Sequence, residues 1–429
     1  MRPLARTRLV AALASAALVA PLTAGGALVA PAAAAETTTR QITYTQWDTQ
    51  QQLTEGRFAG TRALRGSLRL ASPTATVRYT DPHGYGTKTY ELGRWVSPWT
   101  SPGYAFDELI PSWDASTPRD SWILVQVRGF SESGRRSKWY TMARWSGGDA
   151  KFHRTSPGTQ TDDLATVDVD TLKARYSMGF TRYQLRVTLL RRKGTTARPS
   201  VDTVGAMTSL LPAVSRVARS KPGVASGLRP LTMPRYSQQI HSGHYPQYDG
   251  GGNAWCSPTS VSMVLGRLDR LPSAQEYSWV PSDHTHPWVD HAARRQYDHG
   301  WQGAGNWPFS TAYAATLADS AFVTRLRNLR EAERFIRAGI PLVASVKFGR
   351  GELSGSPISA TNGHLLVIVG FRANGDVVVN DPAAWTNRGV RRTYDRAEFE
   401  NAWIPKSGGL VYVIHNDDRP LPTTATTNW

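Results

Sequence analysis

The sequence predicts an all-β sandwich or jelly-roll domain over residues 36–212, followed by an α+β domain over residues 232–416. In the first part, short runs such as Ser121–Arg128 and Tyr183–Leu190 mix β-branched and apolar residues with polar ones, and Gly, Pro, Ser and Asp clusters separate them. Long helical periodicity is absent there. In the second part, a helical pattern after Cys256 precedes several apolar runs of strand length.

The first 35 residues have the parts of a secretory signal. Arg2, Arg6 and Arg8 precede an Ala/Leu/Val-rich run, and residues 31–35 offer a small-residue cleavage site. No later segment has the roughly 18 uncharged apolar residues that a membrane-spanning helix needs. We therefore expect a secreted protein, extracellular or associated with the cell wall, without a transmembrane segment.

The formal net charge of +17 favours acidic partners, and we expect an anionic cell-wall polymer to be one that the basic surface could bind. We do not expect nucleic acid, because the arginines are scattered and the protein is predicted to be exported. The sequence has no phosphate-binding Gly-Lys-Ser/Thr loop and no paired-cysteine zinc spacing. ATP use, a structural zinc site and other cofactors are therefore not expected.

Two further segments differ in composition. Residues 213–231 mix basic residues with Gly and Pro, which predicts an exposed linker open to proteolysis, and residues 417–429 predict a disordered Thr/Pro tail. The first domain is rich in tryptophan: Trp95, Trp99, Trp113, Trp122, Trp139 and Trp145. Exposed tryptophan can stack on sugars, but a sandwich core also needs large side chains, so glycan binding, a pro-domain and a structural role stay open. Trp122, inside an apolar strand, is predicted to be core.

Cys256 is the only cysteine of the chain. Cysteines of exported proteins usually pair as disulfides, so a single one is either a thiol in use or a small buried apolar residue. Pro258 fits the first turn of a helix. Apolar residues then recur at helical spacing: Val261, Val264, Leu265 and Leu268. Cys256 is thereby placed at a helix N-terminus, where the dipole and free N–H groups stabilise a thiolate nucleophile.

Two apolar runs, NGHLLVIVGF and DVVVNDPAAW, are separated by Arg372–Gly375 and predict a β-hairpin. With a four-residue loop, Asp381 lies opposite Leu366 and on the same face as His364, whereas Asn380 points the other way; a bulge would reverse this. Taken singly, such a histidine is more often a satisfied residue, and an Asp before Pro is more often a turn former. Together they can complete a Cys–His–acid triad.

With these motifs, residues 232–416 resemble the papain-like cysteine peptidases of the bacteriocin-processing type, cysteine peptidase family thirty-nine, and especially their stand-alone secreted members. The segment MPRYSQ looks like the family's leading strand and ends at Gln238. The resemblance implies that Cys256 attacks, His364 transfers the proton and Asp381 holds the imidazole. Gln238 and the Cys256 N–H would donate to the oxyanion.

The sequence departs from the family at Ser257, where the family usually has Gly, and this serine could crowd the oxyanion site. Gln239 also competes with Gln238 as the donor. We expect a secreted cysteine peptidase that hydrolyses a peptide or protein substrate through an acyl-enzyme. Two alternatives stay open: a cell-wall or glycan-binding protein with a degenerate peptidase-like domain, and a thiol acyltransferase.

The segment between the nucleophile and the base holds four histidines among acids and tryptophans: His284, His286, His291 and His299. Their spacing matches no familiar zinc site, and we predict no metal here. We expect this segment to form a wall of the substrate groove. The predicted groove residues are Trp255, Trp288, Trp301 and Trp307.

Overall fold

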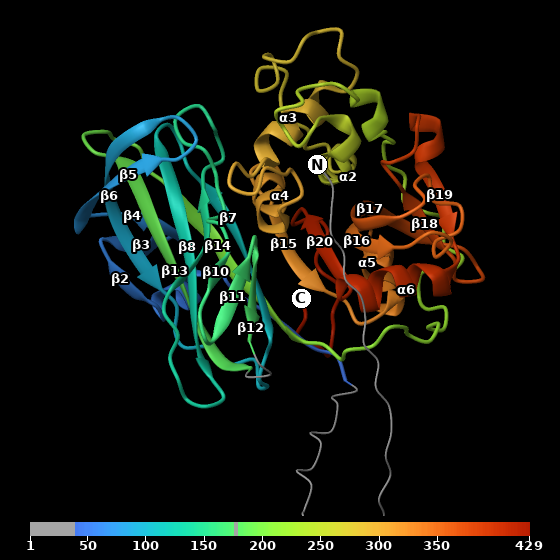
Figure 1. The fold of residues 1–429 in the computed structure, drawn as a ribbon, viewed down its shortest axis with the longest axis horizontal. Coiled ribbons are helices and arrows are strands. Elements are labelled where there is room, and N and C mark those ends of the chain that lie inside the picture. The colour runs from blue at the N-terminus through green and yellow to red at the C-terminus, as the bar shows by residue number, and fades with distance from the viewer. Residues whose placement is uncertain (1–38, 176–178) are drawn as a thin grey trace, which may run out of the picture. The chain divides into compact units, whose positions relative to one another are not determined.

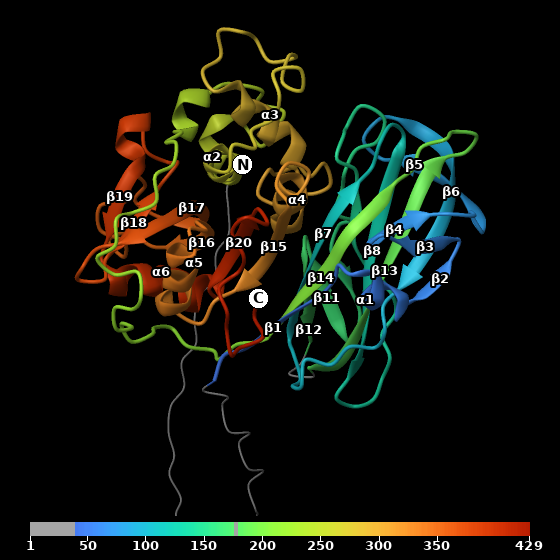
Figure 2. The same cartoon turned by 180° about the vertical axis from the view of Figure 1, so that it is seen from behind.

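The computed structural model describes residues 39–175 and 179–429, so the predicted secretory signal over residues 1–35 lies outside the described residues. The described residues belong to one compact unit. A sandwich-like β region comes first in the chain, and a region of mixed α/β content follows it (Figures 1 and 2). No described helix is both long enough and apolar enough to cross a membrane.

Two antiparallel sheets and a short helix, α1 (Gln50–Thr54), make up the first region. One sheet has the order β10-β11-β12-β7-β14-β4-β3, with β1 also paired to β14: β1 (Gln41–Trp47), β3 (Thr61–Leu64), β4 (Ser67–Leu70), β7 (Glu108–Ser116), β10 (Gln160–Thr161), β11 (Ala165–Asp168), β12 (Thr171–Ala174) and β14 (Ser200–Leu210). The other has the order β2-β6-β13-β8-β9, with β5 also paired to β6: β2 (Arg57–Ala59), β5 (Ala75–Asp81), β6 (Gly86–Val96), β8 (Ser121–Ser131), β9 (Tyr140–Trp145) and β13 (Phe180–Arg192).

Aromatic side chains fill the core of this region. Trp47 meets Trp95 edge to face with ring centroids 5.8 Å apart, and both rings are buried. Trp122 is buried in a smaller cluster, where it stacks on Phe152 at 4.6 Å. The prediction that Trp122 is a core residue is therefore confirmed.

The second region is built on one sheet with the order β15-β20-β16-β17-β18-β19. Its strands are β15 (Ser320–Arg325), β16 (Leu342–Phe348), β17 (Thr361–Phe371), β18 (Val377–Asn380), β19 (Arg391–Tyr394) and β20 (Leu410–His415). Its helices are η1 (Gln238–His241), η2 (Gly252–Ala254), α2 (Cys256–Arg267), α3 (Pro287–Gln296), α4 (Trp307–Ala314), α5 (Leu329–Arg337), η3 (Asn387–Val390) and α6 (Arg396–Ser407).

Both faces of this sheet are covered. Leu365 and Val367 of β17 belong to the core that contains α2 and α3, whereas Leu366 and Ile368 belong to the core that contains α5 and α6. A strand buried on both faces needs a continuous apolar run, which is why β17 shows no alternation of apolar and polar residues.

The predicted hairpin forms between β17 and β18, but its turn is one residue longer than expected and spans residues 372–376. A bulge at Val369 absorbs the extra residue, and Val367 pairs with Asn380. This is the register that a four-residue loop predicts, and Asp381 directly follows it. The predicted loop length was therefore wrong, but the predicted strand register is observed, because the longer turn and the bulge compensate for each other.

Residues 213–231 were expected to be an open linker, yet their backbone is held against the second region. The N–H groups of Gly223 and Ala225 donate to the Glu333 carboxylate at 3.0 Å. Glu333 is fully buried and also pairs with the guanidinium of Arg396 at 2.9 Å. Many side chains of this segment are exposed, but composition alone could not show that a buried carboxylate binds its backbone N–H groups.

The predicted disorder of residues 417–429 is wrong for the last of these residues. The buried side chain of Asn428 donates to the Arg325 carbonyl and to Glu331 at 3.0 Å each. The Trp429 ring lies 4.8 Å from the ring of Phe335. The segment has no regular secondary structure, as its composition suggests, but these side chains anchor it.

Candidate active site

Cys256 is the first residue of α2, and its thiol is free and partly exposed. The preceding residue, Trp255, provides no side-chain cap, so the N–H groups of the first turn remain available. One turn along the helix, the Ser260 hydroxyl donates to the Leu365 carbonyl at 3.1 Å. This bond ties the nucleophile helix to β17 beside His364.

His364 and Asp381 form a buried pair, with Nε2 of the imidazole 2.8 Å from one carboxylate oxygen. That oxygen also accepts the Ala383 N–H at 3.0 Å. The other carboxylate oxygen accepts the Tyr394 hydroxyl at 2.6 Å. Because Nε2 faces Asp381, Nδ1 is the nitrogen left for a proton exchange with Cys256.

The electrostatics of this pair favour separated charges. Burial lowers the pKa of His364, but the charge and hydrogen bond of Asp381, followed by the Cys256 side chain, raise that pKa to about 10. Burial raises the pKa of Asp381, but His364 and the hydrogen bonds from Tyr394 and Ala383 bring it below its ordinary value. An imidazolium held beside a thiol stabilises the thiolate form.

Gln238 is buried at the start of η1, and its backbone N–H donates to the Pro382 carbonyl at 2.9 Å. One hydrogen of its Nε2 group is used on the Asn253 carbonyl at 2.6 Å, which leaves the second for another acceptor. The backbone of Gly252 lies so close to that of Gln238 that a Cβ added at Gly252 would lie 2.5 Å from the Gln238 carbonyl oxygen. Position 252, one of the three glycines at 250–252, therefore has no room for a side chain. Gln239 also borders the cleft but is half-buried.

Ser257 does not face the cleft. Its hydroxyl is fully buried, 2.9 Å from the Ser310 hydroxyl and 3.2 Å from Oε1 of Gln296. The Tyr412 hydroxyl lies 3.4 Å away in the same polar cluster. The serine therefore points behind the nucleophile instead of crowding it.

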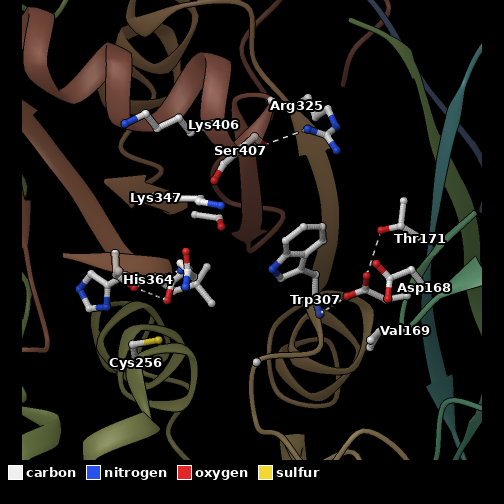
Figure 3. A pocket seen from close by; sticks show the side chains of 18 of the residues that line it. Asp168, Val169, Thr171, Cys256, Trp307, Arg325, Lys347, His364, Lys406 and Ser407 are labelled. Atoms are coloured by element: carbon white, nitrogen blue, oxygen red, sulfur yellow. Dashed lines mark hydrogen bonds between the residues drawn. The ribbon is translucent and has the colours of Figure 1, made fainter. Parts of the chain in front are cut away.

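Cys256, His364 and Gln238 open into a cleft of about 800 Å³. Figure 3 shows the Trp307 indole between Cys256 and His364 on one side and Asp168 on the other. Charged side chains of both signs border the cleft: Arg40, Lys173, Arg325, Lys347, Lys406, Asp107, Glu108, Asp168, Asp170 and Asp249. The first β region thus contributes part of the wall.

Two of the four predicted groove tryptophans, Trp301 and Trp307, border this cleft. The Trp307 N–H donates to a carboxylate oxygen of Asp170 at 3.0 Å, which fixes the start of α4. The other two predictions are wrong. Trp255 is fully buried, and Trp288 packs against Tyr236 at 5.7 Å, outside the cleft lining.

The histidine-rich segment is not a single cluster. His291 accepts from the Trp279 indole, whereas His299 lies 4.3 Å from the ring of His153. Of the four histidines, only His284 lies beside Asp290, with Nδ1 3.4 Å from a carboxylate oxygen. Asp290, His241 and His244 form a group of possible metal ligands among the described residues. The sequence argument missed these three residues and Tyr394, although the His-x-x-His spacing of His241 and His244 was an available signal.

Comparison with known protein families finds two matches. Residues 43–209 match the "Peptidase C39 N-terminal domain", and residues 230–410 match the "Peptidase_C39 like family". No curated protein is similar enough to the chain to count as a match.

Solved structures resemble the chain only weakly. The enzymatically active domain of bacteriophage CBA120 tailspike protein 4 has a TM-score of 0.19 and 6% identity, over 37% of this chain and 20% of the tailspike chain. TmCBM61, solved with β-1,4-galactotriose, has a TM-score of 0.18 and 8% identity, over 40% and 89%. LamAcat from Zobellia galactanivorans has a TM-score of 0.18 and 11% identity, over 34% and 79%. Similarities this low say nothing about the ligands of this chain.

Proposed function

Because this chain belongs to the C39-like cysteine peptidase family, we propose that it is a secreted thiol peptidase that uses Cys256, His364 and Asp381 in a papain-like domain. The observation that carries the proposal is the buried His364–Asp381 pair at 2.8 Å. Its histidine borders the same cleft as a free thiol at a helix N-terminus. The predicted signal over residues 1–35 supports export.

The reaction starts with attack of the Cys256 thiolate on the carbonyl carbon of a peptide bond, which forms a C–S bond. The oxyanion accepts hydrogen bonds from the free amide hydrogen of Gln238 and from the Cys256 N–H. The His364 imidazolium gives its proton to the leaving amine as the C–N bond breaks. Neutral His364 then takes a proton from water, which attacks the thioester and releases the acid and the thiolate.

Asp381 acts through His364. Its carboxylate holds the ring so that Nδ1 faces the thiol, and its charge stabilises the imidazolium. Trp301 and Trp307 offer apolar surface to substrate side chains along the cleft. We therefore propose extended peptides as the substrate class.

Alkylation of Cys256 by iodoacetamide across a pH series tests the activated thiol. We expect fast labelling at and below neutral pH in the wild type, and slow labelling in His364→Ala, because that variant lacks the imidazolium that holds the thiolate. His83→Ala, which changes a histidine of the first region, is the control and should label like the wild type. Equally slow labelling of all three proteins would contradict the proposal.

Hydrolysis of a fluorogenic peptide library tests the reaction itself. Cys256→Ala and His364→Ala should abolish turnover and keep the far-UV circular dichroism of the wild type. Full activity of Cys256→Ala would end the proposal. Incorporation of an added amine into the product, in place of water, would identify the chain as an acyltransferase with the same triad.

A second candidate function, binding of an anionic wall polymer, is favoured by the arginines of the first region. The Arg128 guanidinium carbon lies 5.1 Å from the Trp99 ring centroid and 4.4 Å from that of Trp139, and Arg186 lies 4.3 Å from Trp139. Both arginines donate to neutral glutamines, and no described carboxylate pairs with either. Tryptophan faces covered by guanidinium groups suit an anion better than a neutral sugar.

Co-sedimentation of the full chain with purified anionic cell wall tests this second candidate. We expect Arg128→Gln/Arg186→Gln to bind less at every salt concentration than the wild type. Arg135→Gln, which removes an arginine already paired with Asp163, is the control and should bind nearly as the wild type. Equal binding by all three proteins would contradict the candidate.

A further inference from the structure

Three histidine side chains surround one buried carboxylate in the second region. Asp290 of α3 is fully buried. Nδ1 of His241 lies 2.9 Å from one of its oxygens, and Nδ1 of His244 lies 2.8 Å from the other. Nδ1 of His284 lies 3.4 Å from the oxygen that His244 approaches. The same ring nitrogen of all three histidines therefore converges on this carboxylate.

Hydrogen bonds to Asp290 do not account for all three histidines. The two carboxylate oxygens take one hydrogen bond each, from His241 and His244, but Nδ1 of His284 is buried and has no hydrogen-bond partner among the described residues. The His284 ring stacks on that of His244 with centroids 3.7 Å apart, and the Nδ1 atoms of both rings are turned toward the same oxygen of Asp290.

We propose that His241, His244, His284 and Asp290 bind one divalent transition-metal ion of the zinc class. Imidazole nitrogens and carboxylate oxygens are ligands that zinc prefers, and four protein ligands are typical of a structural zinc site. The ligand atoms of His241, His244 and Asp290 already lie within 4.8 Å of one another. A cation among them accepts lone pairs from all three rings and offsets the charge of the carboxylate.

The proposed ion stabilises the segment that leads to the nucleophile. His241 ends η1, which begins at Gln238, and His244 follows it, whereas Asp290 belongs to α3. The ring of His241 also lies 6.0 Å from that of Trp255, the residue before Cys256. The ion therefore fastens the chain between the oxyanion donor and the nucleophile to α3.

This site is distinct from the catalytic cleft, because none of the four ligands borders the cleft. The ion has no part in the chemistry of Cys256. Its binding can be measured whether or not the chain is a peptidase, so failure of one proposal leaves the other standing.

Metal content of the full chain tests the inference. Bound metal is first removed from the protein with a chelator. The protein is then dialysed against Zn²⁺ or Co²⁺, excess ion is removed, and the bound metal is quantified by elemental mass spectrometry. We expect about one ion per chain and, with Co²⁺, the intense visible absorption of a tetrahedral site. His244→Ala and His284→Ala should retain less than about a tenth of the wild-type ion.

The side chains of His244 and His284 are each about one-fifth exposed, at 22% and 20%, so their replacement spares the core. The matched control is His286→Asn, two residues from His284, where φ is +55° and asparagine tolerates the left-handed backbone. This variant should bind like the wild type. Wild-type protein that takes up neither ion, or full binding by both alanine variants, would overturn the inference.

Melting temperature gives a second readout. Zn²⁺ should raise the melting temperature of the stripped wild type, because a ligand that binds only the folded state stabilises it. His244→Ala should show no rise, and His286→Asn should show the full rise. An equal rise in His244→Ala would assign the effect to another site and contradict the proposal.

Discussion

Replacing Tyr394 by phenylalanine tests the environment of the acid. The Tyr394 ring is fully buried against Phe399, and its hydroxyl donates to Asp381 at 2.6 Å. The other oxygen of Asp381 is already used by His364 and the Ala383 N–H. Tyr394→Phe keeps the ring and leaves one oxygen of a buried carboxylate without any described donor.

The expected loss of stability in Tyr394→Phe follows from the missing hydrogen bond to Asp381. A hydrogen bond to a charged group contributes about 1.5–3 kcal/mol, so we expect Tyr394→Phe to lower the free energy of unfolding by about 2 kcal/mol near neutral pH. The Tyr394 bond lowers the pKa of Asp381 in the folded state. Its contribution is therefore present above the ordinary value of 3.8 and is lost as the pH falls through the lower folded pKa. The difference between the two proteins should shrink in acid.

Urea unfolding followed by tryptophan fluorescence measures this difference. The control is Tyr313→Phe, because the buried hydroxyl of Tyr313 has no hydrogen-bond partner in the part of the chain that the structure describes. Removing it should change the free energy of unfolding by less than about 0.5 kcal/mol, or stabilise the fold. Equal losses in both variants, or a loss below about 0.5 kcal/mol in Tyr394→Phe, would refute the reasoning.

Three further outcomes are expected. The raised pKa of His364 contributes stability that is complete below its ordinary 6.5 and is lost as the pH rises through about 10, so the urea midpoints of wild type and His364→Gln should converge over that range; a constant gap would contradict this. Glu333→Gln breaks the buried pair with Arg396, so we expect a loss of about 3–5 kcal/mol and faster tryptic cleavage within residues 213–231, and an unchanged digestion would refute it. Asn428→Ala removes buried hydrogen bonds and should lower stability by about 2 kcal/mol; an unchanged urea midpoint would argue against the anchored tail.

Local patterns carried most of the site prediction. The start of α2 at Cys256 follows from the apolar spacing and the proline of its first turn, and both depend on residues close in the chain. The alignment of His364 with Asp381 depends only on strand parity. The predicted register is observed because the longer turn and the bulge at Val369 cancel, and no sequence rule anticipates that cancellation.

Contacts between segments far apart in the chain could not be predicted from the sequence. Trp255 adjoins the nucleophile in sequence, but the turn into α2 directs its ring inward, where the indole donates to the Tyr248 carbonyl at 2.7 Å. Tyr394 reaches Asp381 only because β19 pairs with β18. The histidines that contact Asp290 lie up to 49 positions from it in the chain, as His241 does. Residue type and spacing do not predict such contacts, because they depend on how the strands and helices pack against one another.

The parts of the candidate site are held mainly by groups other than the proposed catalytic atoms. The Gln238 N–H is fixed on the Pro382 carbonyl, next to Asp381, and α2 is fixed to β17 through Ser260. Neither contact uses the thiol or the imidazole. Removing the Cys256 sulfur should therefore leave Gln238 and Asp381 where they are. Activity lost in such a variant can be assigned to chemistry, whereas activity lost in a Ser260→Ala variant would report the position of the helix.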